Sequence, residues 1–305
     1  MAGPPDRNEA DHADGTVSWA ELLAEAERRL HDAGMEPAAA DARRIVEQAS
    51  GRRGAELTLA IDEPARRRAV AHFDAMLERR LTGEPLQYVL GEWSFRTLEL
   101  MVDRRVLIPR PETEVVAGVA LDELDRLRAV DPARPSRIAD LGTGSGAIAL
   151  SIAAERDRVE IWGTDVSPDA LAVASANLAG LGMRARVVRL VEGSWFAALP
   201  HDLRGELDLV VSNPPYVAAS ESLPREVADW EPGLALVSGP TGLEALEHLV
   251  DRSVEWLRRP GALVLELAPD QAGLLERLAR RRGYAEVRVV PDLAGRPRAL
   301  AARLP

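Results

Sequence analysis

The stretch RIADLGTGSGAIALSIAA, residues 137–154, combines an apolar run, a turn with three glycines and an alanine-rich run. RIADLG is typical of a buried strand, and GAIALSIAA is typical of a helix that packs on a sheet. The glycines between them allow a sharp turn and let the backbone approach a ligand closely. The stretch therefore predicts a strand–turn–helix unit of an α/β sheet.

The same alternation of strand and helix continues toward the C-terminus. Strand-like runs follow at residues 159–165, 185–190, 207–213 and 262–268, with helical stretches between some of them. This order predicts a mostly parallel, doubly wound sheet with right-handed crossovers. EVRVVPD (286–292) and RALAARL (298–304) have no helix between them, so we expect them to close the sheet as an antiparallel pair.

The N-terminal part of the chain has a different pattern. Residues 1–16 are polar and rich in Pro, Gly and Asp, so we expect a disordered tail there. Residues 17–84 contain three helical patterns and predict a small helical domain. Ser18 and Glu21 have the spacing of a capping box before the first helix, and we expect Pro64 to open the third.

Residues 85–110 change character again. The runs YVLGEWSF (88–95) and LELMVDRRVLI (98–108) alternate or run apolar like short strands, which predicts a β-hairpin linker. We expect residues 111–305 to form the main domain, because the repeated strand and helix patterns all fall within them.

The composition excludes several classes of function. The printed sequence contains neither cysteine nor lysine, which excludes a cysteine nucleophile, a thiolate zinc site, a lysine Schiff base and a P-loop. The net charge is 38 − 49 = −11, which argues against a general nucleic-acid binder. There is no apolar run of about 18 residues and no signal-peptide pattern, so we expect a cytoplasmic protein.

Asp140 stands directly before the glycine loop, whose pattern is Gly142-x-Gly144-x-Gly146. A dinucleotide site has the spacing G-x-G-x-x-G and places a pyrophosphate on the helix N-terminus. A carboxylate before the loop would repel a pyrophosphate but would suit a cationic ligand. The alternative is a glycine turn that only packs the helix on the strand.

Asp165 is the last residue of the next predicted strand. A carboxylate there can accept hydrogen bonds from both ribose hydroxyls of a nucleoside. Alone, it would more often be a turn residue at the end of a strand. Together with the glycine loop it predicts an adenosine site, and the acidic Asp140 favours S-adenosylmethionine over NAD.

The tetrapeptide Asn213-Pro214-Pro215-Tyr216 follows the apolar run LDLVVS at the end of a predicted buried strand. Open α/β sheets place their active sites at these carboxyl ends. Both prolines hold the backbone extended, so the Asn213 side chain and the Pro214 carbonyl can accept hydrogen bonds from one –NH2 group. The Tyr216 ring can pack against a planar amide or base. The alternative is a rigid loop without function.

In these residues the chain resembles the class I S-adenosylmethionine-dependent methyltransferases that methylate planar nitrogens. Within that class it resembles the PrmC/HemK family, the release factor glutamine methyltransferases. The resemblance covers roughly residues 18–305 and is carried by GEPLQYVLGEWSF, VDRRVLIPRPETE, DLGTGSGAIALSIA, GSWF, VVSNPPYV, LALVSGPTGL and DLAGRPR. It implies an α/β fold with a Rossmann-like, mostly parallel seven-stranded sheet, a small N-terminal helical domain and a β-hairpin linker.

The resemblance also implies roles for particular residues. The methionine part of S-adenosylmethionine would be lined by Gly142, Thr143, Gly144, Ser145 and Gly146. Asp165 would hold the ribose, and Trp195 would lie near the adenine. Asn213 would contact both methyl donor and substrate, and the whole tetrapeptide Asn213–Tyr216 would grip the glutamine amide.

The activity implied by the resemblance is transfer of a methyl group to the side-chain nitrogen (N5) of the glutamine in the Gly-Gly-Gln motif of peptide chain release factors. The helical domain would help to dock the release factor. We expect a monomer with no metal and no direct contact to nucleic acid or membrane.

Two positions depart from the pattern of the family. Ala268 stands where Gly is expected, and Thr241 stands where an acidic residue is common. The same chemistry on a metabolite amide or, with less support from the charge, on a nucleic-acid base therefore stays open as an alternative. A non-catalytic binding module of this fold is the third hypothesis.

Overall fold

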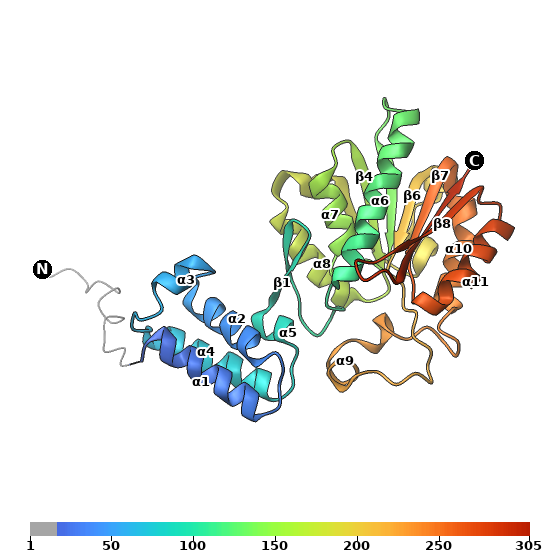
Figure 1. Ribbon diagram of the computed structural model, residues 1–305. Coiled ribbons are helices and arrows are strands. Elements are labelled where there is room, and N and C mark those ends of the chain that lie inside the picture. The colour runs from blue at the N-terminus through green and yellow to red at the C-terminus, as the bar shows by residue number, and fades with distance from the viewer. Residues whose placement is uncertain (1–16) are drawn as a thin grey trace, which may run out of the picture. The chain divides into compact units, whose positions relative to one another are not determined.

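The computed structural model describes residues 17–305, so the disordered tail expected at residues 1–16 lies outside the described residues. The chain divides into two compact units, with the boundary between Gly91 and Glu92 (Figure 1). The first unit is helical, and the second contains the sheet.

Over residues 17–91, the first unit contains five helices packed around one apolar core. They are α1 (Trp19–Asp32), α2 (Ala38–Ser50), α3 (Ala55–Leu59), α4 (Arg67–Leu81) and α5 (Leu86–Leu90). The predicted capping box is present, because the Glu21 N–H donates to the Ser18 hydroxyl and the Ser18 N–H donates to the Glu21 carboxylate. The side chains of Leu30, Ile45 and Phe73 are fully buried in the core of this unit.

Two expectations for this unit are wrong. The third predicted helix, α4, begins at Arg67 rather than at Pro64, because Pro64 forms a short bridge with Ser18 and is held extended. The strand predicted over 88–95 is helical in its first residues, which belong to α5. Pro85 precedes this single turn and Gly91 ends it in the left-handed region at φ 77°.

The predicted hairpin is therefore shorter than residues 85–110. It consists of β1 (Glu92–Phe95) and β2 (Leu98–Met101), paired antiparallel with Phe95 opposite Leu98. Within the second unit, Asn177 of α8 (Pro168–Gly180) holds β2 in place, because its Oδ1 accepts from the Met101 N–H at 2.7 Å and its Nδ2 donates to the Met101 carbonyl at 3.1 Å.

The second unit is built on a seven-stranded sheet in the order β5-β4-β3-β6-β7-β9-β8. Its strands are β3 (Ser136–Leu141), β4 (Val159–Asp165), β5 (Val188–Glu192), β6 (Leu207–Ser212), β7 (Leu257–Glu266), β8 (Glu286–Pro291) and β9 (Pro297–Leu304). The first five pair in parallel, and β9 lies antiparallel to both β7 and β8. The sequence-based expectation of a mostly parallel sheet closed by an antiparallel pair is confirmed.

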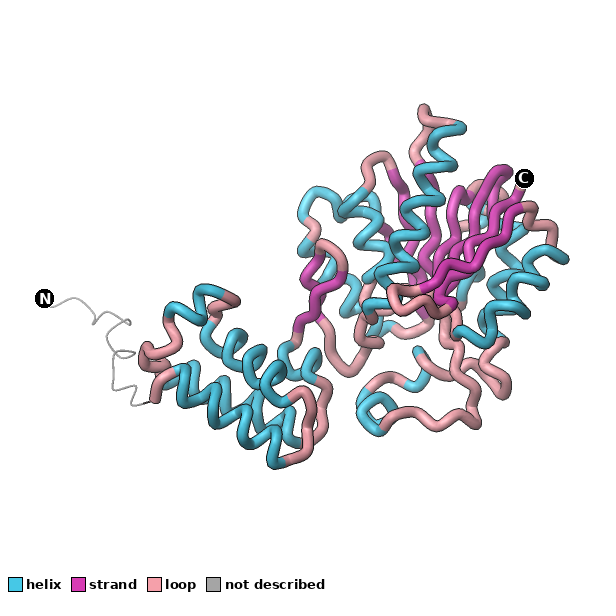
Figure 2. The backbone as a smooth tube through the Cα atoms, in the orientation of Figure 1, coloured by secondary structure: helices cyan, strands magenta, loops and turns pink. Residues whose placement is uncertain are grey.

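Helices cover both faces of this sheet (Figure 2). They are α6 (Pro111–Val130), α7 (Ala147–Glu155), α8 (Pro168–Gly180), α10 (Glu244–Trp256) and α11 (Ala272–Arg281). A further helix, α9 (Arg225–Trp230), belongs to the loop between β6 and α10 and has no buried residue. Short 3-10 helices lie at Gly182–Val187, Trp195–Ala198, His201–Leu203, Gly233–Ala235 and Pro269–Gln271. α6 and α7 pack in the core on one face, and α10 and α11 pack in the core on the other. Such burial on both faces explains the continuous apolar character of the strands.

The order of the strands locates the site. β3 lies between β4 and β6, so the connections leaving β3 and β6 diverge at their carboxyl ends. A crevice forms where the strand order reverses in this way, and open α/β sheets bind ligands there. The glycine loop follows β3, and the Asn-Pro-Pro-Tyr loop follows β6.

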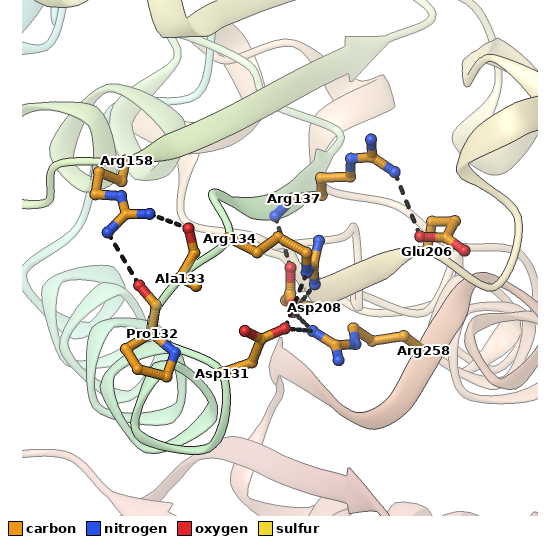
Figure 3. Close-up of polar contacts among 9 residues, drawn as sticks. All are labelled: Asp131, Pro132, Ala133, Arg134, Arg137, Arg158, Glu206, Asp208 and Arg258. Atoms are coloured by element: carbon orange, nitrogen blue, oxygen red, sulfur yellow. Dashed lines mark hydrogen bonds and ion pairs between the residues drawn. The ribbon is translucent and has the colours of Figure 1, made fainter.

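The opposite, amino-terminal edge of the same strands carries an arginine cluster (Figure 3). Asp208 near the start of β6 is 4% exposed and accepts from Arg134 at 2.5 Å and from Arg258 at 3.0 Å. The backbone N–H of Arg137, on β3, donates to its second oxygen at 2.7 Å. Asp208 therefore ties the starts of β3, β6 and β7 together with its charge compensated.

Candidate active site

A cavity of about 570 Å³ lies at the carboxyl ends of β3, β4 and β6. The predicted residues that line it are Asp140, Gly142, Thr143, Gly144, Ser145, Asp165, Trp195, Asn213 and Pro215. Gly146, Pro214 and Tyr216 are not among the residues that line it. The cavity has the size of a small-molecule site.

Asp140 lines this cavity with a carboxyl group that no cation of the protein compensates. It is 1% exposed, and its Oδ2 accepts from the Thr143 hydroxyl at 2.7 Å and from the Ala149 N–H at 3.1 Å. Its Oδ1 is buried and has no hydrogen-bond partner among the described residues. Burial raises the pKa of Asp140 from 3.8 to about 6. A cationic ligand would restore the missing interaction.

The glycines of the loop serve different purposes. Gly142, Gly144 and Gly146 all have positive φ, a backbone conformation that residues with a side chain rarely adopt. A Cβ on Gly142 would lie 3.3 Å from the Trp195 ring, whereas one on Gly144 would meet nothing within 4 Å. Gly146 is the N-cap of α7, and a Cβ there would lie 2.9 Å from Leu150. Gly142 and Gly144 therefore shape the cavity, while Gly146 makes the turn into the helix.

The Asp165 carboxylate is held in a fixed plane by two backbone donors. Its Oδ2 accepts from the Gly144 N–H and its Oδ1 from the Ser167 N–H, both at 2.9 Å. Each carboxylate oxygen has a second lone pair, which stays available to a ligand. The geometry suits a bidentate pairing with two neighbouring hydroxyl groups.

Trp195 has an unusual backbone. Its φ is 47°, in the left-handed region. Among the described residues other than glycine, only Arg96 and Arg158 also have a positive φ. Such a conformation costs on the order of 1 kcal/mol or more for a bulky residue and is found most often at ligand sites. It brings the indole ring against Gly142, where it lines the cavity.

The loop after β6 presents Asn213 to the cavity and is anchored from behind. Asn213 Nδ2 donates to the Thr113 hydroxyl at 3.3 Å. Gln271 Nε2 donates to the Tyr216 carbonyl at 2.9 Å and to the Gly242 carbonyl at 3.2 Å. A Cβ on Gly242 would lie 2.6 Å from the Tyr216 carbonyl oxygen, so glycine is needed there for close approach of the two chains.

The Tyr216 side chain contacts another part of the protein. Its hydroxyl donates to Glu266 Oε1 at 3.2 Å, at the end of β7, and burial raises its pKa. Glu266 Oε2 accepts from the Thr113 hydroxyl at 2.7 Å. That the Tyr216 ring packs against a substrate stays a prediction, because the hydroxyl is used within the protein.

Sequence reasoning missed Thr113 and Glu266. Thr113 lies among charged residues in PRPETE (109–114), namely Arg110, Glu112 and Glu114, and these pair within the protein. Arg110 pairs with Glu231, Glu112 with Arg296, and Glu114 accepts from the Arg96 N–H. Thr113 is the only uncharged polar residue in PRPETE. Its hydroxyl can donate one hydrogen bond and accept others, and this is the signal in the sequence that could have pointed to it.

Sequence reasoning also missed two segments of the cavity wall. Residues 105–109 and 232–238 contribute lining residues, among them Leu234, which is 65% exposed. Glu231 links the two segments, because it accepts from the Ile108 N–H at 3.1 Å and pairs with Arg110.

The doubly wound sheet, the glycine loop, the acidic residue after β4 and the Asn-Pro-Pro-Tyr loop together define a class I methyltransferase. Two family models match the chain, the PrmC N-terminal domain over residues 21–91 and the methyltransferase small domain over residues 124–228. The chain belongs to the family of release factor glutamine methyltransferases, as its relatives show.

The relatives cover nearly the whole chain. The release factor glutamine methyltransferase of Cereibacter sphaeroides is 41% identical over 288 residues, which are 94% of this chain and 98% of that protein. That of Moorella thermoacetica is 41% identical over 286 residues, 92% of this chain and 97% of that protein.

A solved structure supports the fold alone. The catalytic domain of hMettl16, in complex with a MAT2A 3′UTR hairpin, superposes with a TM-score of 0.52 at 15% identity. The match covers 77% of this chain and 81% of that one. Among residues 17–305, no helix is both long and apolar enough to cross a membrane.

Proposed function

We propose that this protein transfers a methyl group from S-adenosylmethionine to the side-chain amide nitrogen (N5) of the glutamine in the Gly-Gly-Gln motif of peptide chain release factors. The observation that carries the proposal is the position of Asn213, which faces a cavity that also contains the uncompensated carboxylate of Asp140. The relatives with 41% identity are named for this activity.

The residues that line the cavity fit the cofactor. S-adenosylmethionine supplies, when bound, a methyl group on a positively charged sulfonium, which is a good leaving group. The unpartnered Asp140 Oδ1 offers an acceptor to the cationic methionine part. The Asp165 carboxylate, already fixed by two N–H groups, offers its remaining lone pairs to the ribose. The Trp195 ring supplies an apolar wall for the adenine.

The loop after β6 orients the substrate amide. An amide nitrogen is a poor nucleophile because its lone pair is delocalised into the carbonyl. Asn213 Oδ1 would accept from one N–H of the amide, the Pro214 carbonyl of the same loop would accept from the other, and together they would orient the nitrogen toward the bound cofactor. The same two oxygens stabilise the positive charge that develops on nitrogen, so their effect is greatest in the transition state.

The reaction needs no strong base in the protein. Once methylated on nitrogen, the amide is a strong acid and loses its proton to water. Positioning and electrostatic stabilisation therefore account for the catalysis in this proposal. The Asn213–Tyr216 tetrapeptide, with Pro214 and Pro215 keeping it extended, is the proposed substrate-binding element.

The partner follows from the proposed substrate. We infer that the helical unit, residues 17–91, helps to dock the release factor, since a family model for this domain matches it. We propose that a single copy of the chain acts. We infer that the enzyme works in the cytoplasm, where release factors act, and that it contacts neither nucleic acid nor membrane directly.

The test is to incubate the protein with S-adenosylmethionine and a purified release factor and to map the methyl group by mass spectrometry. One added methyl on the glutamine of the Gly-Gly-Gln peptide is the expected result. A release factor with that glutamine replaced by glutamate is the matched control and should gain none. An unmodified peptide from a protein that still binds the cofactor would contradict the substrate assignment.

A further inference from the structure

Thr113 and Glu266 form a hydrogen-bonded relay with Asn213, in which Thr113 also lines the cavity and Glu266 does not. Thr113, in the first turn of α6, is 4% exposed, and Glu266, at the end of β7, is 1% exposed. The Thr113 hydroxyl donates to Glu266 Oε2 at 2.7 Å and accepts from Asn213 Nδ2 at 3.3 Å. Three elements that are distant in the sequence thus meet in one hydrogen-bonded chain.

The hydrogen bonds of this relay all point in one direction, from Asn213 through Thr113 to Glu266. An ionised carboxylate accepts hydrogen bonds and cannot donate one. The single proton of the Thr113 hydroxyl is therefore committed to Glu266, and only its lone pairs face Asn213. Of the two ends of the Asn213 amide, only the –NH2 end complements a lone pair.

The same carboxylate also engages the last residue of the tetrapeptide. Glu266 Oε1 accepts from the Tyr216 hydroxyl at 3.2 Å, so one buried group contacts the tetrapeptide at Tyr216 directly and at Asn213 through Thr113. Burial raises the pKa of Glu266, while the hydrogen bond from Thr113 and the Arg298 guanidinium act in the opposite direction and favour the ionised form.

We propose that Thr113 and Glu266 are positioning residues that lock the Asn213 amide in one of its two orientations, with Oδ1 facing the substrate. Within residues 17–305, the bond to Thr113 is the hydrogen bond of the Asn213 side chain, which leaves Oδ1 as the acceptor in the cavity. The inference rests on the proposed function, since it assumes a substrate –NH2 that donates to Oδ1.

The relay also gives a basis for discrimination. A glutamine amide presents an –NH2 group to Oδ1, whereas a glutamate carboxylate presents an acceptor to an acceptor. With the orientation locked, the glutamate form of the release factor binds weakly. Without the lock, Asn213 can rotate and donate to the carboxylate, so the preference for glutamine decreases.

The experiment compares Thr113→Val with Thr113→Ser. The first keeps the shape and removes the hydroxyl, and the second keeps the hydroxyl. We expect Thr113→Val to lower kcat for release-factor methylation by about 10- to 100-fold, with the affinity for S-adenosylhomocysteine within about twofold. Thr113→Ser should stay within about threefold of the parent. Ser151→Ala, which removes a buried hydroxyl without a partner among the described residues, is the matched control and should leave kcat unchanged.

A second measurement separates orientation from simple packing. The glutamate form of the release factor is used as a competitive inhibitor, and its inhibition constant is compared with the KM of the glutamine form. Thr113→Val and Glu266→Gln should both reduce the preference for glutamine by about fivefold or more, because an amide at 266 can donate to Thr113 and reverse the relay.

The outcomes are distinct. An unchanged preference and a kcat within about twofold of the parent in Thr113→Val would overturn the inference, and so would a Thr113→Ser variant as slow as Thr113→Val. If Thr113→Val does not fold, the preference measured in Glu266→Gln decides. A parent protein that does not methylate the release factor at all contradicts the proposed function instead.

Discussion

Asp140 and Asp208 are buried aspartates on the neighbouring strands β3 and β6, and their surroundings differ. Asp140 lies near the carboxyl end of its strand, and Asp208 lies near the amino-terminal end of its own. Asp208 is compensated by two arginines and one backbone N–H. Asp140 has only a hydroxyl and a backbone N–H on one oxygen, and its other oxygen has no partner among the described residues. The same side chain is thus used in two electrostatic settings.

The difference indicates that the two ends of the strands serve different purposes: the amino-terminal ends stabilise the fold, and the carboxyl ends form the candidate site. A buried carboxylate without a cation is unfavourable, because desolvation penalises the charged form. At the amino edge the protein itself supplies the cations and gains a link between strands. At the carboxyl edge we propose that a cationic ligand supplies the missing charge, so that binding compensates what folding leaves uncompensated.

The largest effect is expected at the carboxyl edge. Asn213→Ala should lower kcat by about 100- to 1000-fold, because it removes the acceptor that we propose acts in the transition state. Isothermal titration with S-adenosylhomocysteine and thermal unfolding should show little change in affinity or Tm. Normal turnover in this variant would show that Asn213 has been given the wrong role.

The next effect is expected at the amino edge and on stability only. Asp208→Asn should lower the free energy of unfolding by about 1–3 kcal/mol, because it leaves Arg134 and Arg258 with only the longer ion pairs to Asp131, at 3.6 and 3.8 Å. Those two side chains are 28% and 26% exposed, which keeps the loss below that of a fully buried pair. Urea unfolding measures it, and kcat at a temperature where the variant is folded should match the parent. A loss of kcat without a loss of stability would contradict the comparison.

Asp140→Asn should have the opposite pattern to Asp208→Asn. Removing an uncompensated charge should leave the ligand-free protein at least as stable as the parent, while S-adenosylmethionine binds about 10- to 30-fold more weakly. Thermal unfolding with and without the cofactor measures both quantities. A variant that is strongly destabilised without ligand would show that Asp140 has a structural role like that of Asp208.

The smallest effect is a dependence on pH. Because burial raises the pKa of Asp140 from 3.8 to about 6, the ligand-free folded protein retains a proton that the unfolded chain has released in that interval. The contribution of this group to stability therefore decreases as pH rises from about 4 to about 6.

The cofactor affinity should follow the opposite course. It requires the ionised form of Asp140 and should fall by up to about tenfold for each pH unit below about 6. Titration calorimetry over this range measures the slope. Asp140→Asn should abolish it, and a slope that persists in the variant would assign it to another group.

Most of the candidate site could be predicted because its parts are local. The glycine loop, Asp165 and the Asn-Pro-Pro-Tyr loop are each short segments at the end of a strand, and parallel strands bring such ends to one edge. Thr113 and Glu266 could not be found in this way. Thr113 lies 100 residues before Asn213, Glu266 lies 153 residues after Thr113, and only the packed fold brings them together.

The errors in the fold also have a physical reason. The segment Leu86–Leu90 is short and apolar, and such a run does not distinguish a strand from a helical turn. The difference was made by Gly91, whose left-handed backbone ends a helix. The backbone of Trp195 was equally invisible, because no local pattern announces a bulky residue with φ of 47°.

Gly242 has a consequence for how the specificity of this enzyme can change. It contacts the backbone of the proposed substrate-binding loop, Asn213–Tyr216, and of the residues after it from outside the cavity, with no space for even a methyl group. A single replacement there would displace the main chain at Tyr216 and Ala218 while leaving every cavity-facing side chain chemically intact. Directed evolution toward a bulkier amide could therefore begin at a position that never meets the molecule being modified.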